Sequence, residues 1–432
     1  MNKKGTSAVF LTLAFASMML IVGVLIRASS SAAERSCADA VFQLAGRSVL
    51  SEYDRRLYDE YGIFGVSADE QKVTNRLLLY ANASFQKNIG LAGLLSGGGK
   101  GVDLLKNEVE EIKVSLKDFS LINVDLFERQ IIDYAKSNAI KSIFRPAKSK
   151  NADEGEDGRR TLRNHVVIDD LPSKGLGGFA VSISEIVEKG LPDIAQIALS
   201  GSNSYLTSEY ILSRFQYANS DSENKDHFFR NEIEYILSGK TSDQDNYDSV
   251  RLKLLLLRVM LNDIHIHGDS QKMAAASGVA AAINAAGIPI TPEFVAAAWA
   301  AAEAENDIRL LEEGNKVPLY KSAANWALDL DGLKDAIQNG VSSGFKNAGA
   351  VKPEKTEGSD YHDYLKLFLC LENRERRLLR AMDLIQINLK GSYDEDFLMR
   401  EHYAGFSFSA KVNGESYAYT QTYSPGEYPK EG

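Results

Sequence analysis

The best candidates for chemistry in this sequence are four potential metal ligands in the segment DIHIHGD, residues 263–269. Asp263, His265, His267 and Asp269 occupy alternate positions there, and imidazole and carboxylate groups are common ligands of divalent metals. On a strand, alternate residues share a face and the two histidines would converge, whereas on a helix they would point apart. Because helical patterns flank the segment, we expect an interhelical loop in which Asp269 caps the second helix. A metal site is the alternative.

Few other catalytic signatures occur in the sequence. It contains no H-E-x-x-H or C-x-x-C motif and has only six histidines. The glycine-rich segment at 96–101 has the wrong spacing for a Walker A loop and lacks a hydroxyl residue after Lys100, so we expect a flexible loop there. We therefore expect a protein that is not an enzyme and that needs no cofactor.

The composition is that of a globular chain with an acidic surface. The 432 residues are 44% hydrophobic, which is enough to bury a core, and their formal net charge is 49 − 59 = −10. Because the sequence has no long block of Lys and Arg, we expect no nucleic-acid partner. The two cysteines, Cys37 and Cys370, are too few for a disulfide-rich scaffold. We expect two free thiols, with one long-range bridge as the alternative.

The N-terminal part of the chain predicts one long helix. No proline occurs before Pro146, and apolar residues recur at helical spacing from Ala40 to Leu57. We expect a helix of about 55 residues, roughly 80 Å long at 1.5 Å per residue, that stops at Gly62. Its second half would form a stalk packed against the rest of the protein.

The stretch Ala8–Ile26 is the most apolar part of this helix. It belongs to a run of 22 residues without a charge, which is enough to cross the ~30 Å hydrocarbon core of a bilayer. We interpret it as a membrane anchor, and the two lysines in front of it favour a cytoplasmic N-terminus. The alternatives are a cleaved signal peptide, with Ser31 and Ala33 at its cleavage site, and a buried core helix. The predicted anchor residues are Ala8, Phe10, Leu11, Leu13, Phe15, Met18, Met19, Leu20, Ile21, Val22, Val24, Leu25 and Ile26.

The rest of the sequence predicts mostly helices, with a few strands. Helices are expected at 77–95, 126–143, 232–239 and 246–262 and as a pair within 359–390, one or two strands at 111–125, and an exposed loop at 148–163. Residues 273–304 hold 15 alanines in 32 residues. This predicts a helical hairpin, with Thr291-Pro292 starting its second helix; a second membrane span is the alternative. Alternating aromatic residues around Asn413-Gly414 predict a type I′ β-hairpin at 406–423.

Several segments carry a resemblance to a known family. They are the Lys-Lys-Gly start with its apolar run, VLSEYDRRLYDEYGIF (49–64), VSLKDFSLIN and FERQIIDYAK (within 114–136), EYILSGKTSDQDN (234–246), and the segments 298–326 and 363–389. The chain resembles an exported family of Gram-positive bacteria whose N-terminus is similar to the TadE and TadG proteins of tight-adherence (Flp-type) pilus loci. The resemblance implies a role in assembling or decorating an envelope-spanning machine, and no catalytic residue carries over.

The resemblance departs from the pilin pattern at one point. Pilins are processed after a glycine and carry an acidic residue at the fifth position that follows. Here Gly5 would place Phe10 at that position, and no carboxylate lies between Thr6 and Ile26. A charge in lipid is costly, so the pilins that carry one use it. Its absence favours a retained, TadG-like accessory protein over a filament subunit.

Together these observations predict a mainly helical α+β protein. We expect a cytoplasmic tip and transmembrane helix (1–30), a helical stalk (31–62), an α+β part (63–170) and a mainly helical part ending in the hairpin (171–432). The expected function is that of a single-pass, surface-facing accessory protein that acts through protein–protein contacts in pilus or envelope assembly. The alternatives are an anchored hydrolase or metal-dependent enzyme that uses His265 and His267, and an anchored receptor for a solute or peptide.

The expected partners are the membrane and pilin-like membrane proteins, and the stalk helix offers a route to oligomers. Charged residues gather at the distal end of the stalk, where charge patterning would set the register of a helix–helix contact. The solvated face of an ordinary helix is the alternative. The predicted contact residues are Arg47, Glu52, Asp54, Arg55, Arg56, Asp59 and Glu60.

Overall fold

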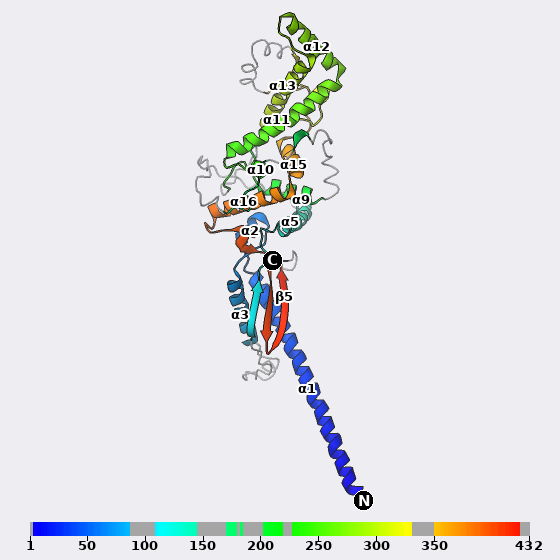
Figure 1. Cartoon of the computed structure of the whole chain (residues 1–432), viewed down its shortest axis with the longest axis vertical. Coiled ribbons are helices and arrows are strands. Elements are labelled where there is room, and N and C mark those ends of the chain that lie inside the picture. The colour runs from blue at the N-terminus through cyan, green and yellow to red at the C-terminus, as the bar shows by residue number, and fades with distance from the viewer. Residues whose placement is uncertain are drawn as a thin grey trace. The chain divides into compact units, whose positions relative to one another are not determined.

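The computed structural model confirms a mainly helical α+β protein (Figure 1). It describes residues 3–86, 109–144, 170–178, 182–184, 202–218, 227–330 and 350–423. The chain divides into two compact units, of which the first comprises Met1–Tyr58, Phe64–Leu126 and Arg400–Gly432, and the second Asp59–Ile63 and Phe127–Met399. The expected ranges 63–170 and 171–432 do not coincide with these units, because the C-terminal strands pair with a strand near residue 110.

The first unit combines long helices with a small antiparallel sheet. Its elements are α1 (Lys3–Leu50), most of the short helix α2 (Arg55–Tyr61), α3 (Glu70–Gln86), and the strands β1 (Val66–Ser67), β2 (Val109–Ser115), β3 (His402–Tyr403), β4 (Gly405–Val412) and β5 (Glu415–Thr422). The larger sheet has the order β2-β4-β5, and β1 pairs with β3. The strand predicted within 111–125 is thus β2, and the helix predicted from residue 77 is α3, which begins earlier.

The predicted C-terminal hairpin is confirmed. β4 and β5 pair in the register Val412↔Glu415, so two residues form the loop. Asn413 has φ of 50° and Gly414 has φ of 83°. A type I′ turn requires positive φ at both of these positions, and asparagine followed by glycine is the pair that adopts them at least cost.

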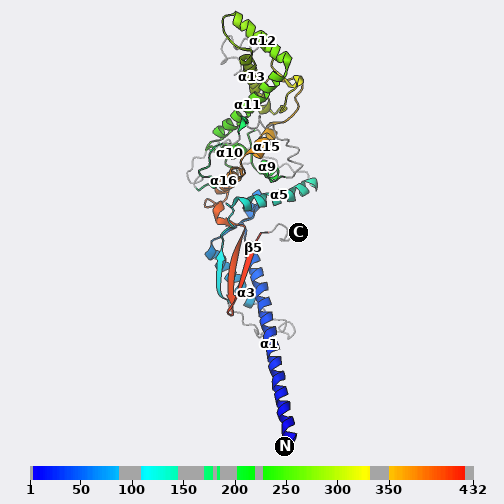
Figure 2. The same ribbon diagram turned by 45° about the vertical axis from the view of Figure 1, so that its right-hand side comes forward.

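One face of the sheet packs against the second half of α1. Phe42 is fully buried, and its ring lies 6.0 Å from that of Phe408, 5.8 Å from Tyr419 and 6.4 Å from Tyr417. α3 also packs against α1 and β2. Figures 1 and 2 both show α1 running beside the sheet and continuing beyond the hairpin loop. The same helix therefore has a half that belongs to the core and a half that does not.

The expected continuous helix to Gly62 is wrong, because α1 ends at Leu50. The chain turns at Ser51 and resumes as α2, whose first turn is capped by Asp54: its carboxylate accepts the N–H of Leu57 at 3.0 Å. The Asp54 N–H meanwhile donates to the carbonyl of Gly65 at 2.8 Å. Capping and this tertiary bond stabilise the break. α1 is therefore about 72 Å long at 1.5 Å per residue, and Gly62, with φ of 67°, follows α2 instead.

The second unit is helical. Its elements are α5 (Val124–Phe144, from Phe127 onward), α9 (Asn203–Arg214), α10 (Glu232–Ser238), α11 (Asp243–Gly268), α12 (Ser270–Ala285), α13 (Pro292–Glu312), the 3-10 turn η1 (Ala323–Asn325), α15 (Tyr361–Leu371) and α16 (Arg374–Ser392); a second 3-10 turn, η2 (Met399–Glu401), leads into β3. The predicted helix pair within 359–390 is confirmed as α15 and α16. The expected loops at 96–101 and 148–163 lie outside the described residues.

The alanine-rich hairpin is confirmed as α12 and α13. Thr291 caps α13 by accepting the N–H of Phe294 at 3.2 Å, and Pro292 opens the helix. Small side chains let the two helices pack closely with the end of α11 around Val295 and Trp299. Among the described residues, one helix is long and apolar enough to cross a membrane, and it is α1. The two cysteines form no disulfide, so the expectation of two thiols is confirmed.

Candidate functional site

The segment DIHIHGD lies at the corner between α11 and α12. α11 extends to Gly268, so Asp263, His265 and His267 belong to its last turns, and the expected loop is wrong for them. No residue in this segment breaks the helix, and histidine is favourable near a helix C-terminus. Asp269 does cap the second helix as expected, because its carboxylate accepts the N–H groups of Gln271 at 2.9 Å and Lys272 at 3.2 Å.

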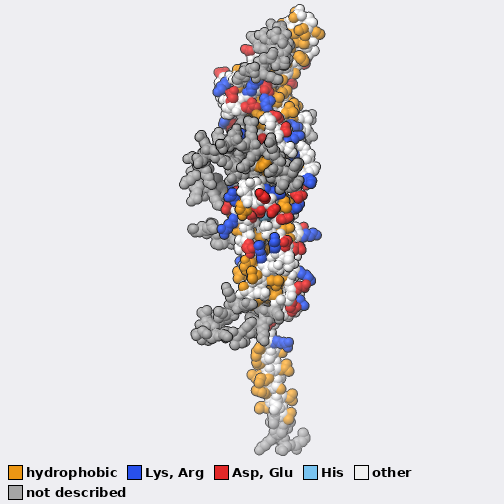
Figure 3. Space-filling model, turned by 90° about the vertical axis from the view of Figure 1, so that its left-hand side faces the viewer, with side chains coloured by type: hydrophobic (Ala, Val, Ile, Leu, Met, Phe, Trp, Pro, Cys, Tyr) orange, Lys and Arg blue, Asp and Glu red, His pale blue; other side chains and the backbone are white. Residues whose placement is uncertain are grey.

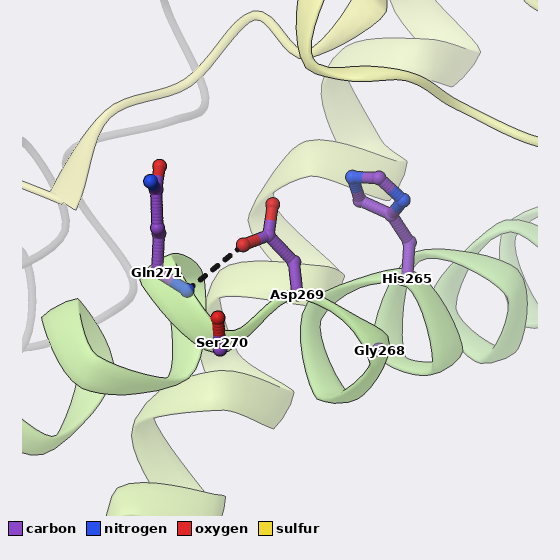
Figure 4. A pocket seen from close by; sticks show the side chains of 5 residues that line it. All are labelled: His265, Gly268, Asp269, Ser270 and Gln271. Carbon is purple, nitrogen blue, oxygen red and sulfur yellow. Dashed lines mark hydrogen bonds between the residues drawn. The ribbon is translucent and has the colours of Figure 1, made fainter.

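An open depression of about 580 Å³ lies over this corner. Its lining residues are His265, Gly268, Asp269, Ser270 and Gln271, shown in Figure 4. The Asp269 carboxylate is engaged with the backbone of Gln271, and the His265 ring lies to one side of it. The depression thus brings one imidazole and one occupied carboxylate together, without a second imidazole.

His267 does not join His265. Its Nδ1 lies 2.9 Å from the carbonyl oxygen of Asp263 and 3.5 Å from the Asp263 carboxylate, both on the preceding turn of the same helix. Residues two apart on a helix do not face each other. The helical conformation therefore separates the two rings, and the four candidate ligands do not gather around one point among the described residues.

His265 is held by aromatic packing. Its ring stacks on Trp326, with centroids 5.3 Å apart, and Lys272 places its ammonium 4.1 Å from the centre of the same indole and 4.9 Å from that of Trp299. Burial, and then the positive charge of Lys272, lower the pKa of His265; burial lowers the pKa of Lys272. Burial and the charge of Lys272 therefore both favour a neutral His265 imidazole, which packs against the indole ring of Trp326.

A buried network of charges lies close to this aromatic cluster and was not predicted. Arg258 donates through Nε to Asp307 at 2.9 Å, and Lys321 lies 2.6 Å from the other oxygen of that carboxylate. Lys321 also forms an ion pair with Glu303, whose carboxylate accepts the N–H groups of Ala327 and Leu328 at 2.9 Å each. Arg258, Glu303 and Asp307 are fully buried. These bonds fasten the segment after α13 onto α11 and α13, which is a structural role.

The sequence carries a signal for this network. An arginine within the leucine-rich run LKLLLLRVML, and Glu303 and Asp307 four residues apart in an alanine-rich helix, are charged groups on faces that must be buried. Buried charges need partners of opposite sign. The position of Lys321 in an irregular segment gives no periodicity from which the partner could be identified.

A second group of potential metal ligands comprises Asp360, His362 and Asp363, whose ligand atoms lie within 4.8 Å of one another. The two carboxylates form the capping box of α15. Asp360 accepts the N–H of Asp363 at 3.0 Å, and Asp363 accepts the N–H of Asp360 at 3.3 Å. The start of a helix explains this arrangement.

The predicted anchor residues form a continuous stretch of exposed apolar side chains in the first unit. From Val9 to Ile26 the large apolar side chains are between 42% and 74% exposed, while the side chain of Ala8 lies outside the described residues. Figure 3 shows this stretch of α1 covered with hydrophobic side chains and without acidic or basic ones. Single exposed leucines are normal on soluble proteins, but a continuous apolar surface of this size is unfavourable in water.

The predicted contact residues do not form one helical face, because the break after Leu50 separates them. Arg47 is exposed on α1 and Arg55 is exposed on α2. Glu52, in the turn, pairs with Arg76 of α3 at 3.0 Å. The other four residues have other roles or positions. Asp54 caps α2, Arg56 is half-buried, and Asp59 and Glu60 belong to the second unit.

The comparisons with known proteins give one result. Residues 157–414 match the model of a family described as "Family of unknown function (DUF5702)". No curated protein and no solved structure matches the chain.

Proposed function

Because the chain belongs to the DUF5702 family, whose function is unknown, its role has to be argued from its own structure, and we propose a single-pass membrane protein with an external body. α1 supports the proposal. Its second half packs against a sheet, whereas the 18 residues Val9–Ile26 are uncharged, mostly apolar and exposed throughout. A bilayer supplies the environment that such a surface needs. The lysines at positions 3 and 4 favour a cytoplasmic N-terminus.

We further propose that the protein is a TadG-like accessory component of a tight-adherence-type pilus or a related envelope assembly, acting through protein–protein contacts. The support is the sequence resemblance together with the join of anchor and sheet in one helix, which holds the first unit next to the membrane. The absence of a carboxylate between Thr6 and Ile26 supports an accessory protein over a filament subunit. The anchored-hydrolase alternative is not proposed, because His265 and His267 do not face each other on α11.

Topology labelling tests the proposal. In a background where Cys37 and Cys370 are changed to serine, we place single cysteines by Ser409→Cys, on the exposed face of β4, and by Lys3→Cys. A membrane-impermeant maleimide should label the first variant in intact cells and the second only after permeabilisation. Labelling of both in intact cells, or of neither, would contradict the orientation.

Carbonate washing separates an anchor from a signal peptide. We expect the mature protein to stay in the membrane pellet after carbonate and high-salt washing, with an intact N-terminal mass. A mature chain that begins near Glu34 and is released by the wash would show that α1 is cleaved, and it would overturn the proposal.

A further inference from the structure

Within the part of the chain that the structure describes, the outer edge of β5 is a row of backbone hydrogen-bonding groups that pairs with no other strand. Among the described residues, the larger sheet ends at β2 on one side and at β5 on the other. The turn bond of the hairpin makes Val412 and Glu415 a hydrogen-bonded pair, and such pairs then alternate along the ladder. The N–H and C=O groups that point away from β4 are therefore those of Ser416, Ala418, Thr420 and Thr422.

This edge lacks the features that usually block strand addition. Ser416, Ala418, Thr420 and Thr422 are all exposed, and they are small and uncharged. Natural edge strands are normally protected by lysine, proline, a bulge or a covering element. Over the eight residues of β5 there is no proline and no basic residue, and the one acidic residue is Glu415, at its start.

The opposite edge of the same sheet is protected. β2 has a register shift between Val109 and Glu111. Its exposed positions carry Glu111 and Lys113, which form an ion pair at 3.1 Å. The N–H of Leu116, just beyond β2, is taken by the carboxylate of Glu70 at 3.3 Å. The contrast between the two edges of one sheet indicates that β5 is left open to bind.

A row of polar residues on α1 lies next to this edge. Arg35, Asp39, Gln43 and Arg47 recur every four residues and are exposed. Arg35 bonds to Glu415 at 3.1 Å, and Asp39 accepts a hydrogen bond from the hydroxyl of Tyr419. The side chains of Ser416, Ala418, Thr420 and Thr422 lie on the face of the sheet away from α1, which we call its outer side. A strand added beside β5 would thus have these small residues as neighbours on its outer side, and the row of Arg35, Asp39, Gln43 and Arg47 on its inner side, toward α1.

The direction of α1 decides between a second copy and another protein. Arg35 lies by Glu415 and Gly46 lies by Gln421, so α1 and β5 run in the same direction. Two identical β5 edges that pair about a two-fold axis are antiparallel, and their α1 helices would then point in opposite directions. Two anchors in one membrane point the same way. This step rests on the proposed function.

We infer that the free edge of β5 is a strand-addition site for an extended segment of a different protein at the membrane surface. Backbone bonds to Ser416, Ala418, Thr420 and Thr422 supply the affinity, and alternate side chains of the segment supply the specificity. The segment carries small or hydroxyl residues on its outer side and uncharged polar residues toward Asp39 and Gln43. This role goes beyond anchoring, because it assigns the contact surface and its chemistry.

The test uses the full chain in lipid nanodiscs and a fluorescent nine-residue peptide of alternating threonine and glutamine. We expect saturable binding by fluorescence anisotropy. A second peptide with the same side chains, N-methylated at every residue, loses the backbone donors of both edges, so it should not bind. This control separates backbone pairing from side-chain adsorption.

Two variants test the location. Ala418→Pro and Thr420→Pro each remove an N–H that points away from β4, and proline is tolerated in edge strands at such positions. Each should weaken peptide binding about tenfold or more, while the matched variant Ala418→Ser should bind as the wild type does. Circular dichroism and retention in nanodiscs verify that the variants fold.

Three outcomes would overturn the inference: no binding of the first peptide, equal binding of the N-methylated peptide, or binding unchanged in both proline variants that fold. A wild-type dimer that the proline variants lose would assign the edge to a second copy and overturn it as well. Failure of the proposed function is distinguishable, because carbonate washing would then release the chain whether or not the peptide binds.

Discussion

Replacing Lys321 by methionine should strongly destabilise the second unit. The substitution leaves the fully buried carboxylate of Glu303 without its ion-pair partner, whereas Asp307 keeps its ion pair with Arg258 and its hydrogen bond from Asn262. Breaking one side of a buried pair costs about 3–5 kcal/mol. With a urea dependence of about 2 kcal/mol per molar, the unfolding midpoint should fall by roughly 2 M.

The assay can be made local. The chain has two tryptophans, Trp299 and Trp326, and their rings lie 5.3 Å apart in the aromatic cluster beside Lys321. Tryptophan fluorescence during urea unfolding therefore reports on this region without interference from the first unit. Because the chain has two compact units, other probes need not give the same midpoint.

A double variant provides the control. Lys321→Met combined with Glu303→Gln removes both charges and keeps an amide oxygen for one of the two N–H groups, of Ala327 and Leu328, that bond to different oxygens of Glu303. We expect it to be more stable than Lys321→Met alone, because no uncompensated charge remains buried. A single variant that costs less than about 1 kcal/mol, or a double variant whose cost equals the sum of the two single costs, would refute the reasoning.

Three further predictions concern Glu234, His265 and Phe42. Burial raises the pKa of Glu234 to about 7 from an ordinary value of 4.5, so the wild type should lose stability, on the order of 3 kcal/mol, as pH rises between these values. The urea midpoint of Glu234→Gln should fall by correspondingly less over the same range. The pKa of His265 is lowered, so its contribution should be present above pH ~6.5 and lost as the pH falls; tryptophan fluorescence should titrate below that pH in the wild type and remain constant in His265→Asn. Phe42→Ala removes a fully buried ring between α1 and the sheet and should cost about 3–5 kcal/mol; limited proteolysis should then cleave the β4–β5 hairpin faster, and an unchanged cleavage rate would contradict the packing described.

Local chemistry accounts for the elements that the sequence predicted well. Asn413-Gly414 specifies its turn through φ alone, and Thr291-Pro292 starts α13 through a cap and a fixed φ. The helix pair α15 and α16 follows from periodicity interrupted at Glu372-Asn373. None of these depends on a distant part of the chain.

The errors arise where distant contacts decide. The helical spacing of apolar residues predicted that α1 continues to Gly62. The backbone hydrogen bond from the N–H of Asp54 to the carbonyl of Gly65 stabilises a turn there, and this spacing cannot reveal such a bond. The pairing of β2 with β4 joins residues about 300 positions apart, so the two units could not be delimited from composition. At the DIHIHGD corner, the packing of His265 on Trp326 depends on a segment some 60 residues away. The alternation of Ile and His at residues 264–267 is not a helical pattern, yet α11 continues through these residues to Gly268.

The pairing of β2 with β4 also fixes an order of events during synthesis. The core that joins Phe42, β2 and Phe408 needs residues from both ends of the chain, so it closes only after the C-terminal hairpin has left the ribosome. The second unit is nearly complete by Met399 and is free to fold earlier, since domains generally fold as units in the order of their synthesis. Until then, the packed face of α1 and the inner side of β2 remain apolar and uncovered. During this time the unfinished first unit is exposed to proteases and to aggregation. The duration is set by the time needed to synthesise the intervening second unit.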